Sequence, residues 1–578
     1  MMYRNRRLLA AVVATAALAA APAAQAGDHF TKQPTATGSG GAAATVDALA
    51  TKAAIDTLRR GGNAIDATVA AAGVLGVTEP FSSGIGGGGF MVIRTRSGKV
   101  TTIDGRETAP ATMRPDTFIT TSGTTTPAFD QVRWSGLSVG VPGTVATWDD
   151  ALDRYGTMSL RKALRPGIHV ARRGFAVDQT FFDQTDAAKA WFDDVPATAA
   201  IYLDPDGTPR DVGTTLRNPD MAKAYEYIAH HGADGFYHGA IARAMAQAAQ
   251  HPPVAGADAT HPWYAGLMTE RDIARYDAIE RKPTHVGYRG LDVWSMGPPS
   301  SGGSTVGEAL NILEGYSPLA ADRVQALHRF IEASRYAFAD RNAYLADPAY
   351  FEVPLRGLLS DSFAAERRAK ITDQAANAVV APGDPYDNEG KSTTHLTVSD
   401  AKGNVVSYTF TIESTGGSGI VVPGWGFLLN NELTDFNYDS TTHPNRAEGG
   451  KRPRSSMAPT IITRDDKPFL AVGSPGGSMI ITTVLQVLLE RLDLGRTLPQ
   501  AIAAPRVSQR NGPTSIAEPA FMETEAPALT ARHGHAFGTP QTEIGAATGI
   551  EFLPGGRLLA AAEPVRRGGG SAAVVSDR

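Results

Sequence analysis

The pattern of the chain changes abruptly near residue 393. Before this point most periodic segments are helical, whereas THLTVSD at 394–400 alternates apolar and polar residues as a strand does. This strand pattern begins at two neighbouring threonines, Thr393 and Thr394, directly after a polar stretch rich in Pro and Gly at 381–390. Helices followed by strands and then further helices predict a layered α/β body with antiparallel strand pairing.

Several segments have patterns that predict single elements. Helices are expected at 46–60, 64–77, most of 144–250, 305–315, 324–345 and 481–492. Strands are expected at 90–95 and 99–104, which form a hairpin around a Ser-Gly turn, and at 394–400, 404–412 and 426–431. The helix at 64–77 is apolar all round, which indicates burial on most sides. The Thr/Gly/Ala-rich stretch 27–45 is expected to be mobile, and 371–392 is expected to be a polar linker.

Composition narrows the class of protein. The chain has 578 residues, more than one ordinary domain, although two closely packed halves would also account for that length. Its net charge is −5, which does not favour a nucleic-acid-binding protein or a polybasic membrane anchor. Cysteine is absent from the sequence, and this excludes disulfides, thiolate zinc sites and a cysteine nucleophile.

The N-terminus has the three parts of an export signal. Arg4, Arg6 and Arg7 precede the apolar run LLAAVVATAALAAAPA, and Ala24-Gln25-Ala26 is a small-x-small cleavage signature. We therefore predict a signal peptide at 1–26, cut after Ala26, and a secreted or periplasmic protein. The Arg6-Arg7 pair leaves the twin-arginine route open. No later segment reaches the ~18–20 uninterrupted apolar residues of a membrane-spanning helix, so no membrane anchor is expected after the signal is removed.

Three familiar kinds of site are disfavoured. GIGGGG at 84–89 matches a dinucleotide motif, with Asp104 as a possible ribose ligand, but that motif must follow a strand and open a helix. Here a helical pattern precedes it and a strand pattern follows, so a tight structural turn is favoured. The paired histidines at 230–231 and at 533 and 535 have no metal-ligand spacing and are expected to be exposed or capping. A G-x-S-x-G nucleophile elbow is absent from the sequence.

The paired threonines offer another chemistry. A threonine hydroxyl needs a base beside it to act as a nucleophile. If the chain were cut just before such a threonine, its new α-amino group, with an ordinary pKa of ~7.7–8.0, could serve as that base. The alternative is a Thr-rich strand without chemistry, because Thr is common in strands. The loop GSPGGS at 473–478 is likewise either an oxyanion hole built from backbone N–H groups or an ordinary strand–helix connection.

An ordered set of blocks resolves these alternatives. SGIGGGGF, GRETAP, TTH at 393–395, NNELTDF, KRPRSSMAPT and GSPGGS occur in this order, and together they closely resemble the γ-glutamyltransferase family of N-terminal-nucleophile hydrolases. GGNAIDA, VGVPGTVA, PPSSGG and EPVRRGGG are similar to further blocks of that family. The resemblance runs from about residue 46 to about residue 571.

The resemblance implies a protein that cuts itself. The cut is expected between Ser392 and Thr393, giving a large subunit at 27–392 and a small subunit at 393–578. The two subunits are expected to fold jointly as a four-layer αββα sandwich, an α+β fold. Thr393 is then the nucleophile, and Thr394 and His395 have supporting roles in the strand. No metal or organic cofactor is implied.

The resemblance also assigns the site residues. Thr411 matches the threonine whose hydroxyl supports the nucleophile, and Gly476 and Gly477 match the oxyanion-hole pair. The expected substrate is a γ-glutamyl amide such as glutathione. Its γ-glutamyl group is expected to form an ester with Thr393, which water or an amino acid or peptide acceptor then attacks. The residues matching those that bind its α-carboxylate and α-amino group are Arg106, Ser455, Ser456, Glu413, Glu432 and Asp435. Arg106 suits the binding of the α-carboxylate, since a guanidinium can donate two hydrogen bonds to a carboxylate.

Two departures keep other substrates open. Glu413 stands where many members carry Asn, and with Glu432 and Asp435 it places three acids around one ammonium, so that one of them could stay protonated. Only the short segment 437–450 separates Phe436 from Lys451, where some members have a longer lid. The short segment predicts an open cleft. An amidase for other acyl donors, such as a cephalosporin acylase or a poly-γ-glutamate-processing enzyme, remains an alternative function. An uncut, non-catalytic relative is a further one.

Overall fold

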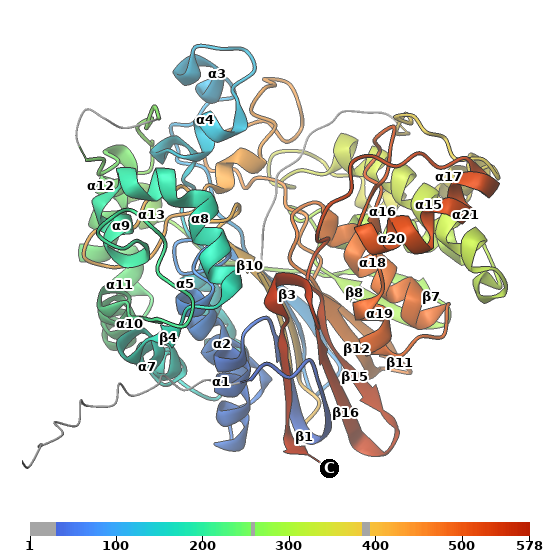
Figure 1. Cartoon of the computed structure of the whole chain (residues 1–578), viewed down its shortest axis with the longest axis horizontal. Coiled ribbons are helices and arrows are strands. Elements are labelled where there is room, and N and C mark those ends of the chain that lie inside the picture. Colours follow the sequence, from blue (N-terminus) through green and yellow to red (C-terminus); the bar gives the residue numbers. More distant parts are fainter. Residues whose placement is uncertain (1–30, 256–260, 384–393, 578) are drawn as a thin grey trace, which may run out of the picture.

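A computed structural model describes residues 31–255, 261–383 and 394–577 (Figure 1). The predicted signal peptide at 1–26 and the two residues of the predicted cut, Ser392 and Thr393, lie outside the described residues. Within the described ranges, no helix is both long enough and apolar enough to cross a membrane.

One hydrogen-bonded path of strands forms the centre of the molecule. Its order is β6-β3-β2-β10-β9-β1-β16-β15-β12-β11-β8-β7, and β17 also pairs with β1. The strands before the predicted cut are β1 (Thr35–Thr45), β2 (Gly88–Arg94), β3 (Val100–Gly105), β6 (Ile279–Arg281), β7 (Thr284–Tyr288) and β8 (Leu291–Ser295). Those after it are β9 (Thr394–Asp400), β10 (Val405–Thr411), β11 (Thr460–Arg464), β12 (Lys467–Gly473), β15 (Thr548–Leu553), β16 (Arg557–Ala562) and β17 (Ser571–Asp577). Strands from both predicted subunits therefore alternate in one sheet.

Helices cover the strands from two sides (Figure 1). On one side α1 (Ala48–Arg59), α2 (Ala64–Thr78) and α5 (Thr144–Tyr155) contact the strands around β2 and β9. On the other side α14 (Gly302–Glu314), α15 (Arg323–Tyr344), α18 (Met479–Leu492) and α19 (Leu498–Ala503) belong to the layer next to β7, β8 and β12. Both sides bury an extensive hydrophobic cluster, which makes this a mixed helix and sheet fold.

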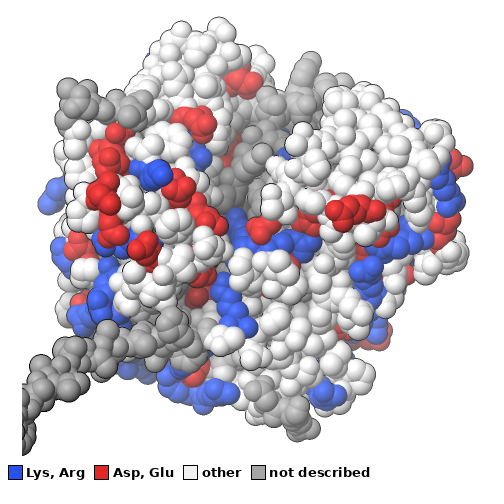
Figure 2. Space-filling model, viewed as in Figure 1, with Lys and Arg blue, Asp and Glu red and all other residues white. Residues whose placement is uncertain are grey.

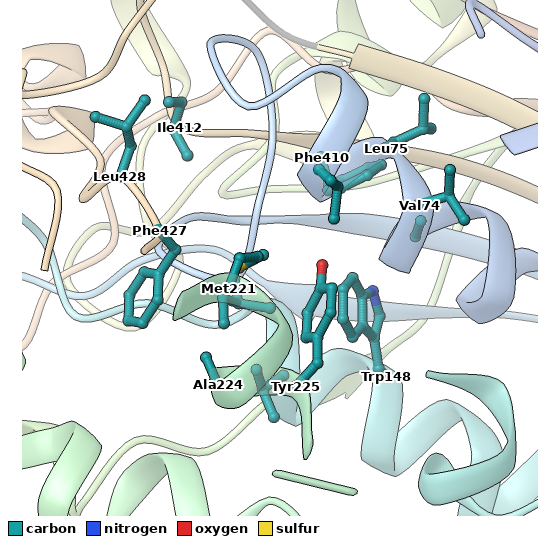
Figure 3. Packing of buried hydrophobic residues seen from close by; sticks show 14 of the residues in the cluster. Val74, Leu75, Trp148, Met221, Ala224, Tyr225, Phe410, Ile412, Phe427 and Leu428 are labelled. Atoms are coloured by element: carbon teal, nitrogen blue, oxygen red, sulfur yellow. The ribbon is translucent and has the colours of Figure 1, made fainter. Parts of the chain in front are cut away.

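The helix α2 shows how sequence pattern leads to packing. All of its residues are buried, as its apolar composition predicts, and Asn63 caps its first turn by accepting the N–H groups of the second and third helical residues. Figure 3 shows Val74 and Leu75 of α2 beside Trp148 and Tyr225, whose side chains come from other helices. The Tyr225 hydroxyl donates to the carbonyl of Gly73 at 2.8 Å, so even the polar atom at this contact has a partner.

The two halves of the strand path also contact each other. β9 and β10 contact β12 and β15 although they do not pair with them. The Ser407 hydroxyl of β10 donates to the Val472 carbonyl of β12 at 3.3 Å. A Cβ on Gly473 would lie 2.4 Å from the ring of His395, so the two strand groups approach closely at that glycine.

Two predictions about local structure are wrong. The stretch 27–45, expected to be mobile, contains the strand β1, whose second half is buried between β9 and β17. Small residues suit this position, since a Cβ on Gly38 would lie 2.0 Å from the Ser576 carbonyl. The segment 426–431 is not a strand, because only Leu428 forms an isolated bridge, with Val421. The hairpin of β2 and β3 and the helices expected around residues 46–77 are confirmed.

Candidate active site

The start of β9 lies beside the end of β10. Thr394, the first described residue of β9, is opposite Phe410, the residue before Thr411. Thr411 is buried, and its hydroxyl accepts the backbone N–H of Glu413 at 2.8 Å. Thr393 lies outside the described residues, so its nucleophilic role stays a prediction.

The glycines of the GIGGGG motif bring the two predicted subunits together at this point. Gly88 and Gly89 open the strand β2, which pairs with the end of β10. A Cβ on Gly87 would lie 1.8 Å from the Thr411 carbonyl, and one on Gly86 would lie 1.9 Å from the Leu428 carbonyl. The motif therefore allows backbone to pass against backbone, and it opens a strand rather than the helix that a dinucleotide site needs. Asp104 is also unavailable as a ribose ligand, because buried ion pairs with Arg281 and Arg452 engage it.

The loop GSPGGS connects β12 to α18, as the sequence predicts. Gly476 and Gly477 have φ angles of 134° and 59°, which favour glycine. Their carbonyl oxygens accept hydrogen bonds from the first two residues of α18, at 3.2 and 2.9 Å. Among the described residues, neither backbone N–H has a recorded acceptor, so both remain able to bind an incoming oxygen.

Arg106 is the centre of a buried charge cluster. Its guanidinium forms ion pairs with the carboxylates of Glu432 and Asp435, and its side chain is fully buried. Its Nε and Nη2 also donate to the carbonyls of Pro453 and Arg454, both at 3.0 Å. Burial opposes the charge of Arg106, but the carboxylates around it outweigh burial and raise the pKa of the guanidinium above its ordinary value.

The asparagine pair before Glu432 holds this cluster in place, and the sequence analysis did not assign it a role. The Asn430 amide donates to the carbonyls of Gly86 and Gly140 at 2.7 and 2.8 Å, and its oxygen accepts the Glu432 N–H at 3.0 Å. The Asn431 amide donates to the carboxylate of Glu413. Two neighbouring asparagines inside an apolar run were the signal for this role, because buried amides need partners.

Glu413 lies at a strained and buried position. Its φ angle is 75°, which is uncommon for a residue other than glycine, and only 2% of it is exposed. Its carboxylate accepts hydrogen bonds from the Ser414 hydroxyl and the Asn431 amide. Burial, with Asp435 as the next contributor, raises the pKa of Glu413 to about 7. Glu413 is thus one of several buried acids here with a raised pKa, since burial also raises the pKa of Glu107 to about 8 and that of Glu432 well above its ordinary value.

The two predicted serines lie in the loop that Arg106 grips. The Ser455 hydroxyl accepts the Met457 N–H at 3.1 Å, and the Ser456 hydroxyl accepts a hydrogen bond from Arg341 at 2.6 Å. Since Arg106 donates to the carbonyl directly before Ser455, the serines and the charge cluster belong to one site. Arg106, Glu432, Asp435 and the loop of Ser455 and Ser456 thus form one group of contacts, and Glu413 is joined to it through Asn431.

The prediction of exposed or capping histidines is wrong for 533 and 535. Both are buried, and they form a cluster with His328 of α15. The two imidazoles of His328 and His535 are hydrogen-bonded at 2.8 Å. No group of three or more His, Asp or Glu suited to a metal ion occurs in the part of the chain that the structure describes.

Two cavities differ in whether predicted site residues line them, and the larger of the two has none. The larger, about 540 Å³, lies among α1, α2 and α7 (Arg165–Arg173) and contains none of the predicted site residues. A smaller one of about 350 Å³ includes Gly476 and Ser414 in its lining. The chemistry of the lining residues favours the smaller cavity as the opening of the active site.

Comparison with known proteins gives matches over almost the whole chain. The sequence profile of the Gamma-glutamyltranspeptidase family matches residues 50–573. The glutathione hydrolase proenzyme of Bacillus subtilis (strain 168) is 38% identical over 530 residues, covering 88% of this chain and 87% of that protein. The Acylase ACY 1 proenzyme of Pseudomonas sp. (strain V22) is 36% identical over 551 residues, covering 94% and 95%. A solved structure of a cephalosporin acylase from Bacillus halodurans has a TM-score of 0.82 at 30% identity, covering 96% of this chain and 99% of that one.

Proposed function

The chain belongs to the γ-glutamyltranspeptidase family, and on that premise we propose that it cuts itself before Thr393 and uses the new N-terminal threonine on γ-glutamyl amides. It is an enzyme of the γ-glutamyltransferase and glutathione hydrolase class. The observation that carries the substrate assignment is the buried cluster of Arg106, Glu432 and Asp435. A guanidinium beside two acids offers opposite charges to the α-carboxylate and α-ammonium of a γ-glutamyl group.

The proposed cut divides the chain into subunits of 27–392 and 393–578. Its place is supported by β9, which begins at Thr394 next to the Thr411 end of β10. Since strands from both segments alternate in one sheet, the two products would stay together as a heterodimer. The contacts of β9 and β10 with β12 and β15, with helices outside both groups, support the four-layer αββα arrangement.

The proposed reaction has two halves. The Thr393 Oγ attacks the γ-amide carbonyl carbon while its proton passes to the α-amino group, and the N–H groups of Gly476 and Gly477 stabilise the oxyanion. The C–N bond then breaks, the leaving amine takes the proton, and a γ-glutamyl ester remains on Thr393. Water or an amine attacks this ester, the bond to Oγ breaks, and Oγ recovers its proton. Thr411 supports the nucleophile, and Ser455 and Ser456 assist Arg106 with the carboxylate.

Electrophoresis and a chromogenic assay test this proposal together. Self-cleavage would give bands of about 38 and 20 kDa, in proportion to 60.7 kDa for 578 residues. The purified protein should also release p-nitroaniline from γ-glutamyl-p-nitroanilide. Thr393→Ala should abolish both, whereas Thr415→Ala, a change in a loop residue with no proposed catalytic role, should still be cut. A single uncut chain without turnover would refute the proposal and would leave the non-catalytic alternative.

A second candidate function is an amidase for other acyl groups. It is favoured by the 36% identity to the Acylase ACY 1 proenzyme and by the TM-score of 0.82 with a cephalosporin acylase. Glutathione, a glutaryl amide and poly-γ-glutamate should be assayed side by side. Faster turnover of the glutaryl amide would favour the acylase, because that substrate has no α-ammonium for Glu413, Glu432 and Asp435 to bind.

Export is proposed from the three-part pattern at the N-terminus. The N-terminal residue of the large subunit, taken from culture medium or periplasm, should be Gly27. Mass spectrometry that found residues 1–26 on the exported protein would contradict this.

A further inference from the structure

The cavity of about 540 Å³ has no part in the proposed reaction, because none of the predicted site residues lines it. The helices α1 and α7 both pack on α2, and all three helices contribute to the lining. The volume is within the ~300–1,000 Å³ of pockets that bind small organic ligands. This cavity is therefore large enough to be a second binding site.

One face of α1 forms a wall of the cavity. Leu49, Ala53 and Thr57 recur at every fourth position along this wall, and Arg60 follows directly after the helix. Since Ala53 is small, Val74 of α2 also reaches the lining, although it belongs to the hydrophobic core. The floor of the cavity is therefore apolar.

Another wall comes from α7. This helix approaches α2 closely at Gly167, where a Cβ would lie 2.7 Å from the Gly73 carbonyl. Pro166 and Val170, on either side of Gly167, line the cavity. Apolar side chains thus reach the cavity from three helices.

Cationic side chains also line this cavity. Arg60, Lys162 and Arg165 are among its lining residues, and their side chains have no ion pair or hydrogen bond within the part of the chain that the structure describes. Lys52 lines it as well, but it is paired with Asp56, the one acid among the described lining residues. Three positive charges therefore remain without a partner beside an apolar floor, in a chain whose net charge is −5.

The surface around the cavity is basic too. The helix α6 (Leu160–Ala163) contains two and α7 three Arg or Lys residues, and neither helix contains an acid. Along the lower edge of the face in Figure 2, most charged side chains are Lys or Arg, and Figure 1 shows α1 in this part of the molecule. A local excess of positive charge attracts anions.

We propose that the cavity binds a free amphipathic anion with a single alkyl chain, such as a fatty acid. The chain lies against apolar side chains such as those of Val74 and Val170, where it is removed from water. The headgroup accepts hydrogen bonds from Arg60 or Arg165. This inference goes beyond the proposed function and does not depend on it, because the lining residues all precede the predicted cut.

The lining disfavours other classes of ligand. A neutral alkyl compound leaves the three cations without partners, and a cationic one is repelled by them. A small inorganic anion leaves the apolar floor in contact with water. Only a ligand with both an apolar chain and a negative charge matches the two features of the cavity.

The test compares four probes by equilibrium dialysis against the purified protein. Decanoate should bind with a Kd at least about tenfold lower than that of decanol, the effect expected of one charge-assisted hydrogen bond. Octanoate, which is shorter by two methylene groups, should bind about tenfold more weakly than decanoate. Decyltrimethylammonium should not bind. Absence of decanoate binding, or equal binding of decanoate and decanol, would overturn the proposal.

Variants locate the binding in the cavity. Arg60→Gln and Arg165→Gln should each raise the Kd of decanoate about tenfold and leave that of decanol unchanged. Leu49→Trp, which fills the cavity with a larger side chain, should abolish the binding of both probes. Arg172→Gln is the matched control, because Arg172 lies on α7 outside the lining and pairs with Glu226. Unchanged binding of decanoate in all three cavity variants would overturn the proposal, and the comparison of probes on the wild type decides if a variant fails to fold.

Two other outcomes are distinguished by separate measurements. A protein that floats with phosphatidylglycerol vesicles but binds no free decanoate would show that the basic surface binds a bilayer, and this would overturn the cavity as a site. A protein that binds decanoate but releases no p-nitroaniline from γ-glutamyl-p-nitroanilide would refute the proposed function and leave this site intact.

Discussion

The guanidinium of Arg106 is ion-paired with the carboxylate of Glu432, although 326 positions separate them in the chain. The Arg106 side chain is fully buried, and that of Glu432 is 1% exposed. The pair joins the segments before and after the predicted cut. Arg106 also has Glu107 of its own segment within 3.9 Å, but its pairs with Glu432 and Asp435 form only when the two segments are folded together.

Removing the charge of Arg106 should destabilise the protein as well as inactivate it. Arg106→Met leaves the buried Glu432 and Glu107 and the partly buried Asp435 without their cation, and breaking a buried pair in this way costs about 3–5 kcal/mol. Urea unfolding followed by circular dichroism measures this cost. The double variant Arg106→Met with Glu432→Gln should regain part of the stability but no activity. A single variant as stable as the wild type would show that the pair is not held as described.

A methyl group on Gly87 should disrupt the active site by displacing the end of β10. Its Cβ would lie 1.8 Å from the Thr411 carbonyl, so the end of β10 must move. We expect Gly87→Ala to lose self-cleavage on gels and to show less than about 1% of wild-type turnover, as when an active-site group is displaced. Gly287→Ala, on the strand β7, is the matched control, because its Cβ would meet nothing within 4 Å. Normal processing in Gly87→Ala would refute this account of the glycine motif.

Local pattern predicted the elements whose partners are close in sequence. The hairpin of β2 and β3 and the helix α2 follow from periodicity and turn residues, and the loop at Gly476 follows from its glycines. The strand β1 could not be found in this way, because its Gly, Ala and Thr residues have no periodic pattern. It becomes a strand through pairing with β9, β16 and β17, which lie hundreds of residues away.

Contacts between distant segments, in the site and outside it, escaped prediction for the same reason. Asn430 bonds to Gly86 and Gly140, and His328 bonds to His535. A single sequence can indicate that a buried amide such as that of Asn430 needs partners, but not which distant residues they are. The resemblance to a family supplied the site residues, but not the residues that hold them in place.

The pH dependence of donor binding should depend on Glu413. Its pKa is raised to about 7, mainly by burial and then by Asp435, and an ionised Glu413 binds the substrate ammonium better than a protonated one. The value of kcat/KM for γ-glutamyl-p-nitroanilide should therefore rise with pH through about 7. In Glu413→Gln the part of this rise centred near pH 7 should become smaller, while the ionisations of the Thr393 amine and of Glu107, whose pKa is raised to about 8, remain. Identical pH profiles would contradict the assignment.

The raised pKa of Glu413 also makes the stability of the folded protein depend on pH. Stability should fall over the pH range in which donor binding improves. The folded protein binds a proton at Glu413 more tightly than the unfolded chain, whose pKa is near the ordinary 4.5. This contribution to stability is complete below pH 4.5 and is lost as pH rises through about 7. Melting temperatures of Glu413→Gln should consequently fall less than those of the wild type between pH 5 and pH 8.

The cluster of buried histidines should make the protein sensitive to acid. His328 Nε2 donates to the Thr372 carbonyl at 2.8 Å, so its Nδ1 must accept the hydrogen bond from His535 Nε2. Burial lowers the pKa of His328 to about 4 and that of His535 to about 3, with the cation of Arg335 adding to the effect at His535. Protonating His328 would place two N–H groups against each other and break the bond between α15 and the chain after α21 (Ala526–His533).

The sign of this effect follows from proton counting. Below the ordinary histidine pKa of 6.5 the unfolded chain binds protons that the folded protein excludes, so stability falls with pH from about 6.5 down to about 4. Each histidine contributes a slope of about 1.4 kcal/mol per pH unit in the middle of this range. Urea unfolding at several pH values should show a shallower slope for His535→Gln than for the wild type, and His230→Gln, at an exposed histidine, should leave it unchanged. Because His328 and His535 lie on opposite sides of the predicted cut, a slope that His535→Gln does not alter would mean that this contact does not join the two subunits in solution.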